Sequence, residues 1–175
     1  MRLKFSSSKE HILSKLEYEA VWAIYGKKIE KAFKKIVRLS FKEKTIPVIV
    51  GDYDSNFAGK SLNDPILFRS SVRHKLGTVL HELSHRFLLE YHFEYGGIVL
   101  NDHELIDLFL YDVIKDCFGK FAADERLNYE LTFPEIEITS SWKKIMCKSF
   151  IERQRLLKKI INSSNEFKKD GNLKK

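Results

Sequence analysis

The sequence predicts an α+β fold: a mainly helical single domain with a small mixed or antiparallel three-stranded sheet and two active-site helices that face each other. Apolar residues recur at helical spacing through most of the chain, which indicates long amphipathic helices. Two short runs rich in apolar and β-branched residues, 36–41 and 46–50, flank the polar residues 42–44 in the manner of two strands joined by a turn. A third short run at residues 65–70 supplies the last strand.

Length and composition favour one domain. The chain has 175 residues, of which 43% are hydrophobic and 13% aromatic, and this is enough for a single core. We expect that domain to span residues 1–165, followed by a polar, disordered tail at 166–175. No stretch has the apolar length of a signal peptide or a membrane span, so a cytoplasmic protein with no membrane span is expected. The sequence does not indicate an oligomeric state.

The net charge of +7 and the pI near 9.3 allow several kinds of partner. Lysines concentrate in residues 27–44 and 143–175. Charge of this kind on helices is usually solvated, so we prefer a solvated basic surface to nucleic-acid binding. Cys117 and Cys147 do not form a C-x-x-C pair and are interpreted as buried free thiols.

The first helix is predicted over residues 9–34, with Ser7 as N-cap and Glu10 completing a capping box. Gly26 is a point where this helix could bend, because glycine costs up to about 1 kcal/mol inside a helix. The apolar stripe of the helix is predicted from these residues: Ile12, Leu13, Leu16, Ala20, Ala23 and Ile24.

Among the strands, Pro47 prevents the second from being paired on both sides along its whole length. The third strand, at 65–70, ends a few residues before the next helix. It is either a purely structural strand or one whose edge receives an extended peptide.

The chemistry lies in the next helix, predicted over residues 72–95 and ended by Gly96 and Gly97. It contains the sequence His-Glu-Leu-Ser-His at 81–85. Residues four apart share one face of a helix, so the imidazoles of His81 and His85 can reach one tetrahedral zinc ion while Glu82 is directed toward a metal-bound water. The flanking residues are apolar, where an unpartnered His or Glu would be costly to bury.

A catalytic zinc needs a third protein ligand. A third histidine in the pattern H-E-x-x-H-x-x-G-x-x-H is excluded, since the required Gly and His positions hold Leu88 and Tyr91. The other solution takes a Glu from a downstream helix, which the chain offers at residues 101–112 with Asn101 or Asp102 as N-cap. Glu104 in that helix follows His85 after 18 residues.

This H-E-x-x-H-x18-E arrangement resembles the gluzincins, the thermolysin-like and aminopeptidase-like zinc metallopeptidases, and in size and element order the small single-domain minigluzincins. The likeness covers roughly residues 45–125. It implies one zinc ion per chain, held by His81, His85 and Glu104, with Glu82 as general base in peptide-bond hydrolysis. It also implies a carboxylate near Asp107 that fixes the tautomer of a ligand histidine, although the thermolysin-like spacing would place that residue at position 108.

Two assignments stay open. The oxyanion donor of this family is usually a Tyr or His, and the candidates are His103, Tyr111 and Tyr129. His103 is also the rival of Glu104 as third ligand, although the spacing favours Glu104.

Helices at residues 121–131 and 141–161 complete the predicted fold, the last one capped by Thr139, Ser140 or Ser141. The favoured function is a zinc metallopeptidase acting on a peptide or protein substrate. The alternative is a non-catalytic module that holds a metal and binds a partner or nucleic acid.

Overall fold

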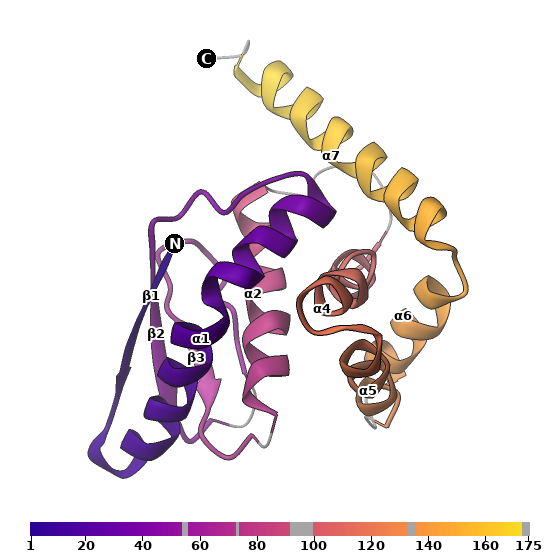
Figure 1. The fold of residues 1–175 in the computed structure, drawn as a ribbon. Helices are drawn as coiled ribbons and strands as arrows, with labels where there is room; N and C mark the ends of the chain where they lie inside the picture. Colours follow the sequence, from indigo (N-terminus) through magenta and orange to yellow (C-terminus); the bar gives the residue numbers. More distant parts are fainter. Residues whose placement is uncertain (54–55, 73, 92–99, 133–135, 173–175) are drawn as a thin grey trace. The chain divides into compact units, whose positions relative to one another are not determined.

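The computed structural model describes residues 1–53, 56–72, 74–91, 100–132 and 136–172 (Figure 1). The chain forms two compact units, Met1–Glu90 and Tyr91–Lys175. Their positions relative to one another are not determined, so each unit is described by itself. Two expectations therefore stay predictions: that residues 1–165 form a single domain, and that the two active-site helices, which lie in different units, face each other.

The first unit is built on a sheet of three parallel strands in the order β1-β2-β3, formed by Arg2–Ser7, Thr45–Gly51 and Ile66–Arg69. The prediction of a mixed or antiparallel sheet is wrong. The partner of β2 comes from before the first helix, not from residues 36–41, and a helix between two neighbouring strands makes a parallel pair. Pro47 lies opposite Lys4 of β1, but β3 joins β2 only from Val48 onward, as the position of the proline predicted.

Helix α1, Ile12–Val37, includes the first two residues of the segment 36–41 that was expected to be a strand. A short 3-10 turn, η1 (Lys9–His11), precedes it, and Ser8 at its N-cap makes no side-chain cap hydrogen bond. The predicted capping box from Ser7 is therefore wrong, and Ser7 ends β1 instead. The helix passes through Gly26 and ends at Arg38, whose φ of 66° is left-handed.

The core of this unit lies on one face of the sheet. Alternate residues of β2 and β3 are buried, among them Ile46, Val48 and Phe68. Tyr18 of α1 stacks on Phe68, with ring centroids 4.6 Å apart. The other buried side chains of α1 follow the same face: Ile29, Ala32, Phe33 and Val37. The predicted apolar stripe at positions 12–24 lies mostly outside this face.

The free edge of β3 is partly covered by residues of its own chain. The backbones of Phe57 and Leu67 exchange two hydrogen bonds, of 3.0 and 2.7 Å, and the side chain of Asn56 accepts one from the Arg69 amide at 2.8 Å. In this conformation the edge is paired at Leu67 and Arg69, which favours the structural interpretation of the strand over peptide addition there.

Helix α2, Lys75–Tyr91, carries the His-Glu-x-x-His sequence. It begins three residues later than predicted, and the proposed ending at Gly96 and Gly97 lies outside the described residues. In Figure 1, α1 and α2 lie on the same side of the sheet. Phe87 of α2 packs against Phe33 and Phe41, with centroid separations of 5.3 and 5.0 Å, which joins the two helices.

The second unit consists of helices in its described part: α3 (Asp102–Asp107), α4 (Leu110–Phe118), α5 (Lys120–Glu130), α6 (Ile136–Met146) and α7 (Phe150–Asn172). The helix predicted at 121–131 is confirmed within a residue. The single helix expected at 101–112 is divided into α3 and α4. The helix expected at 141–161 is likewise two helices, with the proposed capping residues Thr139, Ser140 and Ser141 inside α6. Helix α7 continues into the segment expected to be a tail.

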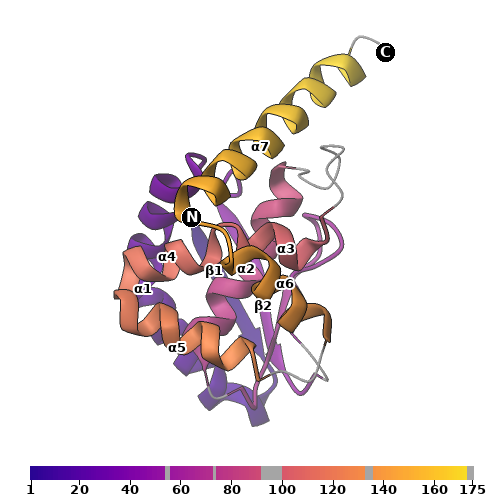
Figure 2. The same ribbon diagram turned by 90° about the vertical axis from the view of Figure 1, so that its right-hand side faces the viewer.

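Within this unit α3 packs against α6, and α4 against α5 (Figure 2). A buried ion pair connects α7 to α4, since Arg153 Nη2 donates to Asp112 Oδ2 at 2.7 Å. Cys117 of α4 is buried, as expected, whereas Cys147 is exposed, so that part of the thiol prediction is wrong. Among the described residues, no helix is long and apolar enough to cross a membrane.

Candidate functional site

The two histidines of the motif lie side by side on α2. Their Nε2 atoms are 3.2 Å apart, and both side chains are half-buried. Two nitrogens that bind the same tetrahedral zinc ion, each at about 2.0–2.1 Å from the metal, lie about 3.3–3.4 Å from each other. The separation in the structure fits a shared ion, and it also suits a hydrogen bond between one Nε2–H and the other ring.

Glu82, the predicted base, belongs to a row of buried polar side chains on α2. Thr78, Glu82, Arg86 and Glu90 are each four residues apart and all buried, so they share one face of the helix. Only 6% of the surface of Glu82 is accessible to solvent. This face is about 100° from His81.

Tyr18 of α1 is the neighbour that sequence reasoning did not connect with Glu82. Burial raises the pKa of the Tyr18 hydroxyl well above its ordinary value, a hydrogen bond with Thr78 opposes this, and the charge of Glu82 adds to the increase. The hydroxyl donates to the carbonyl oxygen of Arg69 at 3.0 Å. The Glu82 carboxyl group therefore lies close to a buried phenol of α1 that is hydrogen-bonded to β3.

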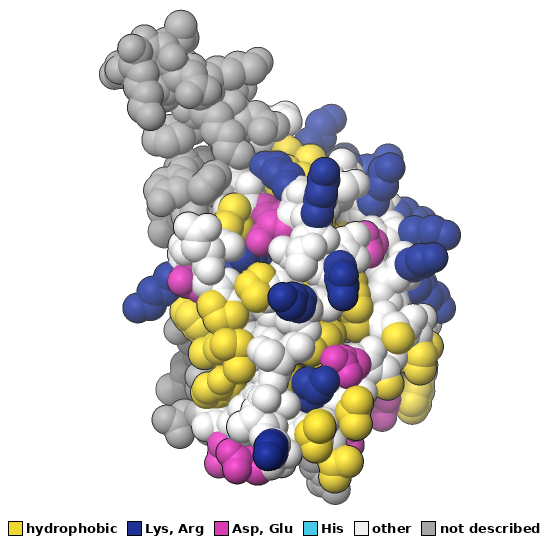
Figure 3. Space-filling view, turned by 90° about the vertical axis from the view of Figure 1, so that its left-hand side faces the viewer, with side chains coloured by type: hydrophobic (Ala, Val, Ile, Leu, Met, Phe, Trp, Pro, Cys, Tyr) yellow, Lys and Arg dark blue, Asp and Glu magenta, His cyan; other side chains and the backbone are white. Residues whose placement is uncertain are grey.

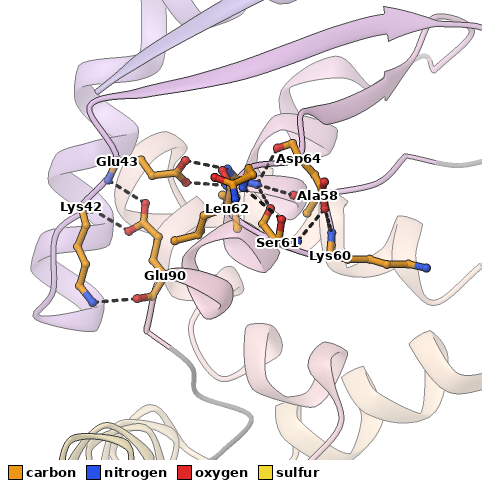
Figure 4. Close-up of polar contacts among 10 residues, drawn as sticks. Lys42, Glu43, Ala58, Lys60, Ser61, Leu62, Asp64 and Glu90 are labelled. Carbon is orange, nitrogen blue, oxygen red and sulfur yellow. Dashed lines mark hydrogen bonds and ion pairs between the residues drawn. The ribbon is translucent and has the colours of Figure 1, made fainter. Parts of the chain in front are cut away.

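Arg86, directly after His85, is fully buried and fixes α2 to two loops. Figure 4 labels its partners in these loops: Glu43, Ala58, Ser61, Leu62 and Asp64. Its Nε and Nη2 atoms donate to the two carboxylate oxygens of Glu43, at 2.6 and 2.7 Å. The guanidinium also donates to four backbone carbonyls of residues 58–64, belonging to Ala58, Ser61, Leu62 and Asp64. Five N–H groups in a rigid fork suit this set of acceptors, which an ammonium group cannot reproduce.

Glu90 continues the row one turn further along. Its carboxylate accepts the backbone N–H groups of Lys42 and Glu43 at 2.8 and 3.1 Å, and Lys42 Nζ donates to its carbonyl at 2.8 Å. Burial raises the pKa of Glu90, and the two backbone donors oppose that increase. Arg86 and Glu90 together hold residues 42–43 and 58–64 against the motif helix.

Sequence reasoning missed Arg86, Glu43 and Glu90 because each is an ordinary charged residue when considered alone. A signal was available. Arg86 and Glu90 follow Glu82 at four-residue intervals on a helix whose flanking residues are apolar, and buried charges at that spacing require partners.

In the second unit the predicted N-cap of α3, the helix expected to carry the third ligand, is confirmed at Asn101. The Asn101 side chain accepts the Glu104 backbone N–H at 2.8 Å, and Glu104 Oε2 accepts the Asn101 N–H at 3.4 Å, which completes a capping box. Glu104 Oε1 accepts from Lys144 Nζ at 2.6 Å. Both carboxylate oxygens of Glu104 therefore accept hydrogen bonds. The Glu104 side chain is mostly buried, whereas the Lys144 side chain is 53% exposed.

His103 is half-buried on α3, beside Glu104. His103 offers an imidazole nitrogen that can bind a metal ion, as His81 and His85 do. Because His103 belongs to the second unit, the geometry fixes only the pair formed by His81 and His85.

Asp107 is buried in the second unit, where the Ser141 hydroxyl donates to its Oδ2 at 2.5 Å. Burial raises the pKa of Asp107 to about 8, the Ser141 hydrogen bond opposes this, and the charge of Glu130 adds to it. The predicted contact with a ligand histidine stays a prediction.

The raised pKa of Asp107 makes the stability of the fold depend on pH. Between the unfolded value near 4 and the folded value of about 8, the native state holds a proton that the unfolded state has lost. The free energy of unfolding should therefore fall by up to about 1.4 kcal/mol per pH unit as pH rises through this range, and then level off. Urea unfolding from pH 5 to 9 in the presence of a chelator measures this slope. Asp107→Asn should remove it; an unchanged slope in this variant assigns it to another group.

The two tyrosine candidates for oxyanion stabilisation also lie in the second unit. The Tyr111 hydroxyl donates to Asp124 Oδ1 at 2.7 Å, and its pKa is raised first by burial and then by this hydrogen bond. The Tyr129 ring lies under the Arg126 guanidinium, 5.4 Å from its carbon to the ring centroid. Tyr111 would have to release Asp124 before it could donate to a substrate.

Comparisons of the chain with protein-family models, curated proteins and solved structures gave no match. The resemblance to gluzincins therefore depends on the motif residues themselves.

Proposed function

We propose that this chain is a zinc-dependent metallopeptidase that hydrolyses a peptide or protein substrate. The observation that carries the proposal is the 3.2 Å separation of the His81 and His85 Nε2 atoms, with Glu82 between them in sequence. Peptide hydrolysis by the zinc-loaded protein and its Glu82→Gln variant tests this function, and cleavage is expected from the wild-type protein alone.

The roles follow from the chemistry of these side chains. A bound zinc ion would lower the pKa of a coordinated water to about 7 and polarise the carbonyl of the bond to be cleaved. His81 and His85 would hold the ion through their Nε2 atoms. Glu82 would accept the proton of the attacking water and transfer it to the leaving amine. The rigid attachment of α2 through Arg86 supports this role, because a base must be held in position to act.

The third ligand is proposed to come from α3, with Glu104 preferred to His103. Glu104 offers a buried carboxylate, but its Oε1 is bound to Lys144. Lys144 is half exposed and can move into water, so zinc binding by Glu104 would cost the loss of one ion pair.

This assignment predicts different effects of two substitutions on zinc affinity. Glu104→Gln keeps an acceptor for the capping box and should weaken zinc binding by more than the roughly 10–100-fold that an outer partner costs. Lys144→Gln releases the carboxylate and should leave zinc binding unchanged or tighter. Competition with a chromogenic chelator measures both affinities. If His103→Ala loses zinc and Glu104→Gln keeps it, His103 is the ligand.

A further inference from the structure

One face of α1 is exposed along the whole helix and changes character halfway. In its first half it carries four exposed apolar side chains, Ile12, Leu13, Leu16 and Ile24, with exposures of 49, 75, 49 and 69%. These residues were expected to help form the core. Instead the unit buries the face that carries Tyr18 and Phe33, and the four apolar side chains are left in water.

In its second half the fully exposed side chains of the same face are cationic. Lys27, Lys31 and Lys34 are exposed and follow one another at intervals of four and three residues, which places them in one row about 10 Å long. Arg38, the exposed C-cap residue of the helix, follows this row. None of these four side chains has an acidic partner within the described residues. At 100° per residue the cationic row and the apolar residues fall on the same side of the helix.

The charge of the chain is concentrated in the unit that contains this face. Residues 1–90 hold 17 Lys and Arg against 10 Asp and Glu, a net +7, whereas residues 91–175 hold 14 of each. Because these numbers are equal in residues 91–175, the second unit contributes nothing to the net positive charge. On the right-hand side of Figure 3, apolar side chains lie low and Lys and Arg side chains lie above them.

We infer that this face of α1 binds the surface of an anionic lipid bilayer. Such a surface offers both parts of what the face needs: an apolar boundary layer for the Leu and Ile side chains, and negative headgroups for the lysines. A nucleic-acid backbone would complement the cationic half and leave the apolar half in water. Two copies of the helix would cover the apolar half and leave most of the lysines without a partner.

The test is co-sedimentation of the full chain with vesicles of phosphatidylcholine, with and without phosphatidylserine, at low and high salt. Binding is expected only with phosphatidylserine and should weaken with salt. Each lysine near an anionic surface contributes about fivefold in affinity, so the triple variant Lys27→Gln/Lys31→Gln/Lys34→Gln should bind about 100-fold more weakly. The double variant Leu13→Ser/Ile24→Ser should bind more weakly with its salt dependence unchanged.

The matched control removes three exposed cations from α7, in the variant Arg155→Gln/Lys158→Gln/Lys159→Gln. It should bind within about twofold of the wild-type protein. Equal losses in the two triple variants would assign the binding to net charge and overturn the proposal, as would the absence of vesicle binding. Binding to duplex DNA but not to vesicles would identify nucleic acid as the partner instead. If Leu13→Ser/Ile24→Ser changes only the sedimentation coefficient and leaves vesicle binding unchanged, the apolar residues bind a second copy of the chain. All substitutions are at exposed positions, and circular dichroism checks that each variant is folded.

Discussion

Replacing Arg86 with leucine is expected to lower the free energy of unfolding by about 3–5 kcal/mol, the range found when one partner of a buried ion pair is removed. The change leaves the Glu43 carboxylate without its bidentate partner and removes the donor from four carbonyls of residues 58–64. Leucine fills part of the volume but satisfies none of these acceptors. Such a loss is a large fraction of the stability of a domain.

Urea unfolding followed by circular dichroism measures this loss. Arg86→Lys keeps the charge but not the fork of donors, so it should recover only a minor part of the stability. Arg155→Leu, an exposed arginine on α7, is the control and should change the free energy by less than about 0.5 kcal/mol. Similar small effects at both positions would show that the buried network does not stabilise the fold.

Glu82→Gln is expected to abolish peptide hydrolysis and leave zinc binding intact. The amide has nearly the shape of the carboxylate but cannot accept a proton, so the rate should fall by about 100-fold or more, the contribution typical of a general base. Initial rates of peptide cleavage, measured beside the zinc content of the same sample, separate loss of chemistry from loss of metal.

Glu90→Gln provides the matched control, because it makes the same chemical change eight residues further along the same face of α2. Glu90 binds the backbone of Lys42 and Glu43, so this variant should lose stability and keep hydrolysis once folded. A Glu82→Gln protein that cleaves peptides at the wild-type rate would contradict the assigned base. A wild-type protein that holds zinc without cleaving peptides would favour the non-catalytic alternative.

The parts of the fold that could be predicted are those specified by local sequence. The helices carrying the motif and the Asn101 cap follow from apolar spacing and a side-chain oxygen at the right place. The sheet could not be predicted correctly, because residues 36 and 37 are β-branched and resemble a strand although they end α1. The missed strand, Arg2–Ser7, is short and finds its partner beyond a 26-residue helix.

The same limit explains the error in the buried face of α1. Apolar residues occur on two sides of this helix, and spacing alone does not tell which side the sheet covers. The aromatic ring of Tyr18 on Phe68 shows which side is buried, and a stacking partner 50 residues away is not visible in a local pattern.

For the candidate site, spacing alone predicted the pair formed by His81 and His85, because a helix fixes the separation of residues four apart. The engagement of Glu104 by Lys144 and of Tyr111 by Asp124 could not be predicted, since each depends on how separate helices pack. The network around Arg86 likewise joins three segments of the first unit.

The most direct test of the proposed function is the zinc content of the purified protein, measured by elemental analysis after dialysis against zinc and then against metal-free buffer. We expect close to one zinc ion per chain in the wild-type protein and in Glu82→Gln, and close to none in His81→Ala and His85→Ala. A wild-type protein that retains no zinc, or histidine variants that retain as much as the wild-type protein, would show that His81 and His85 do not hold a zinc ion.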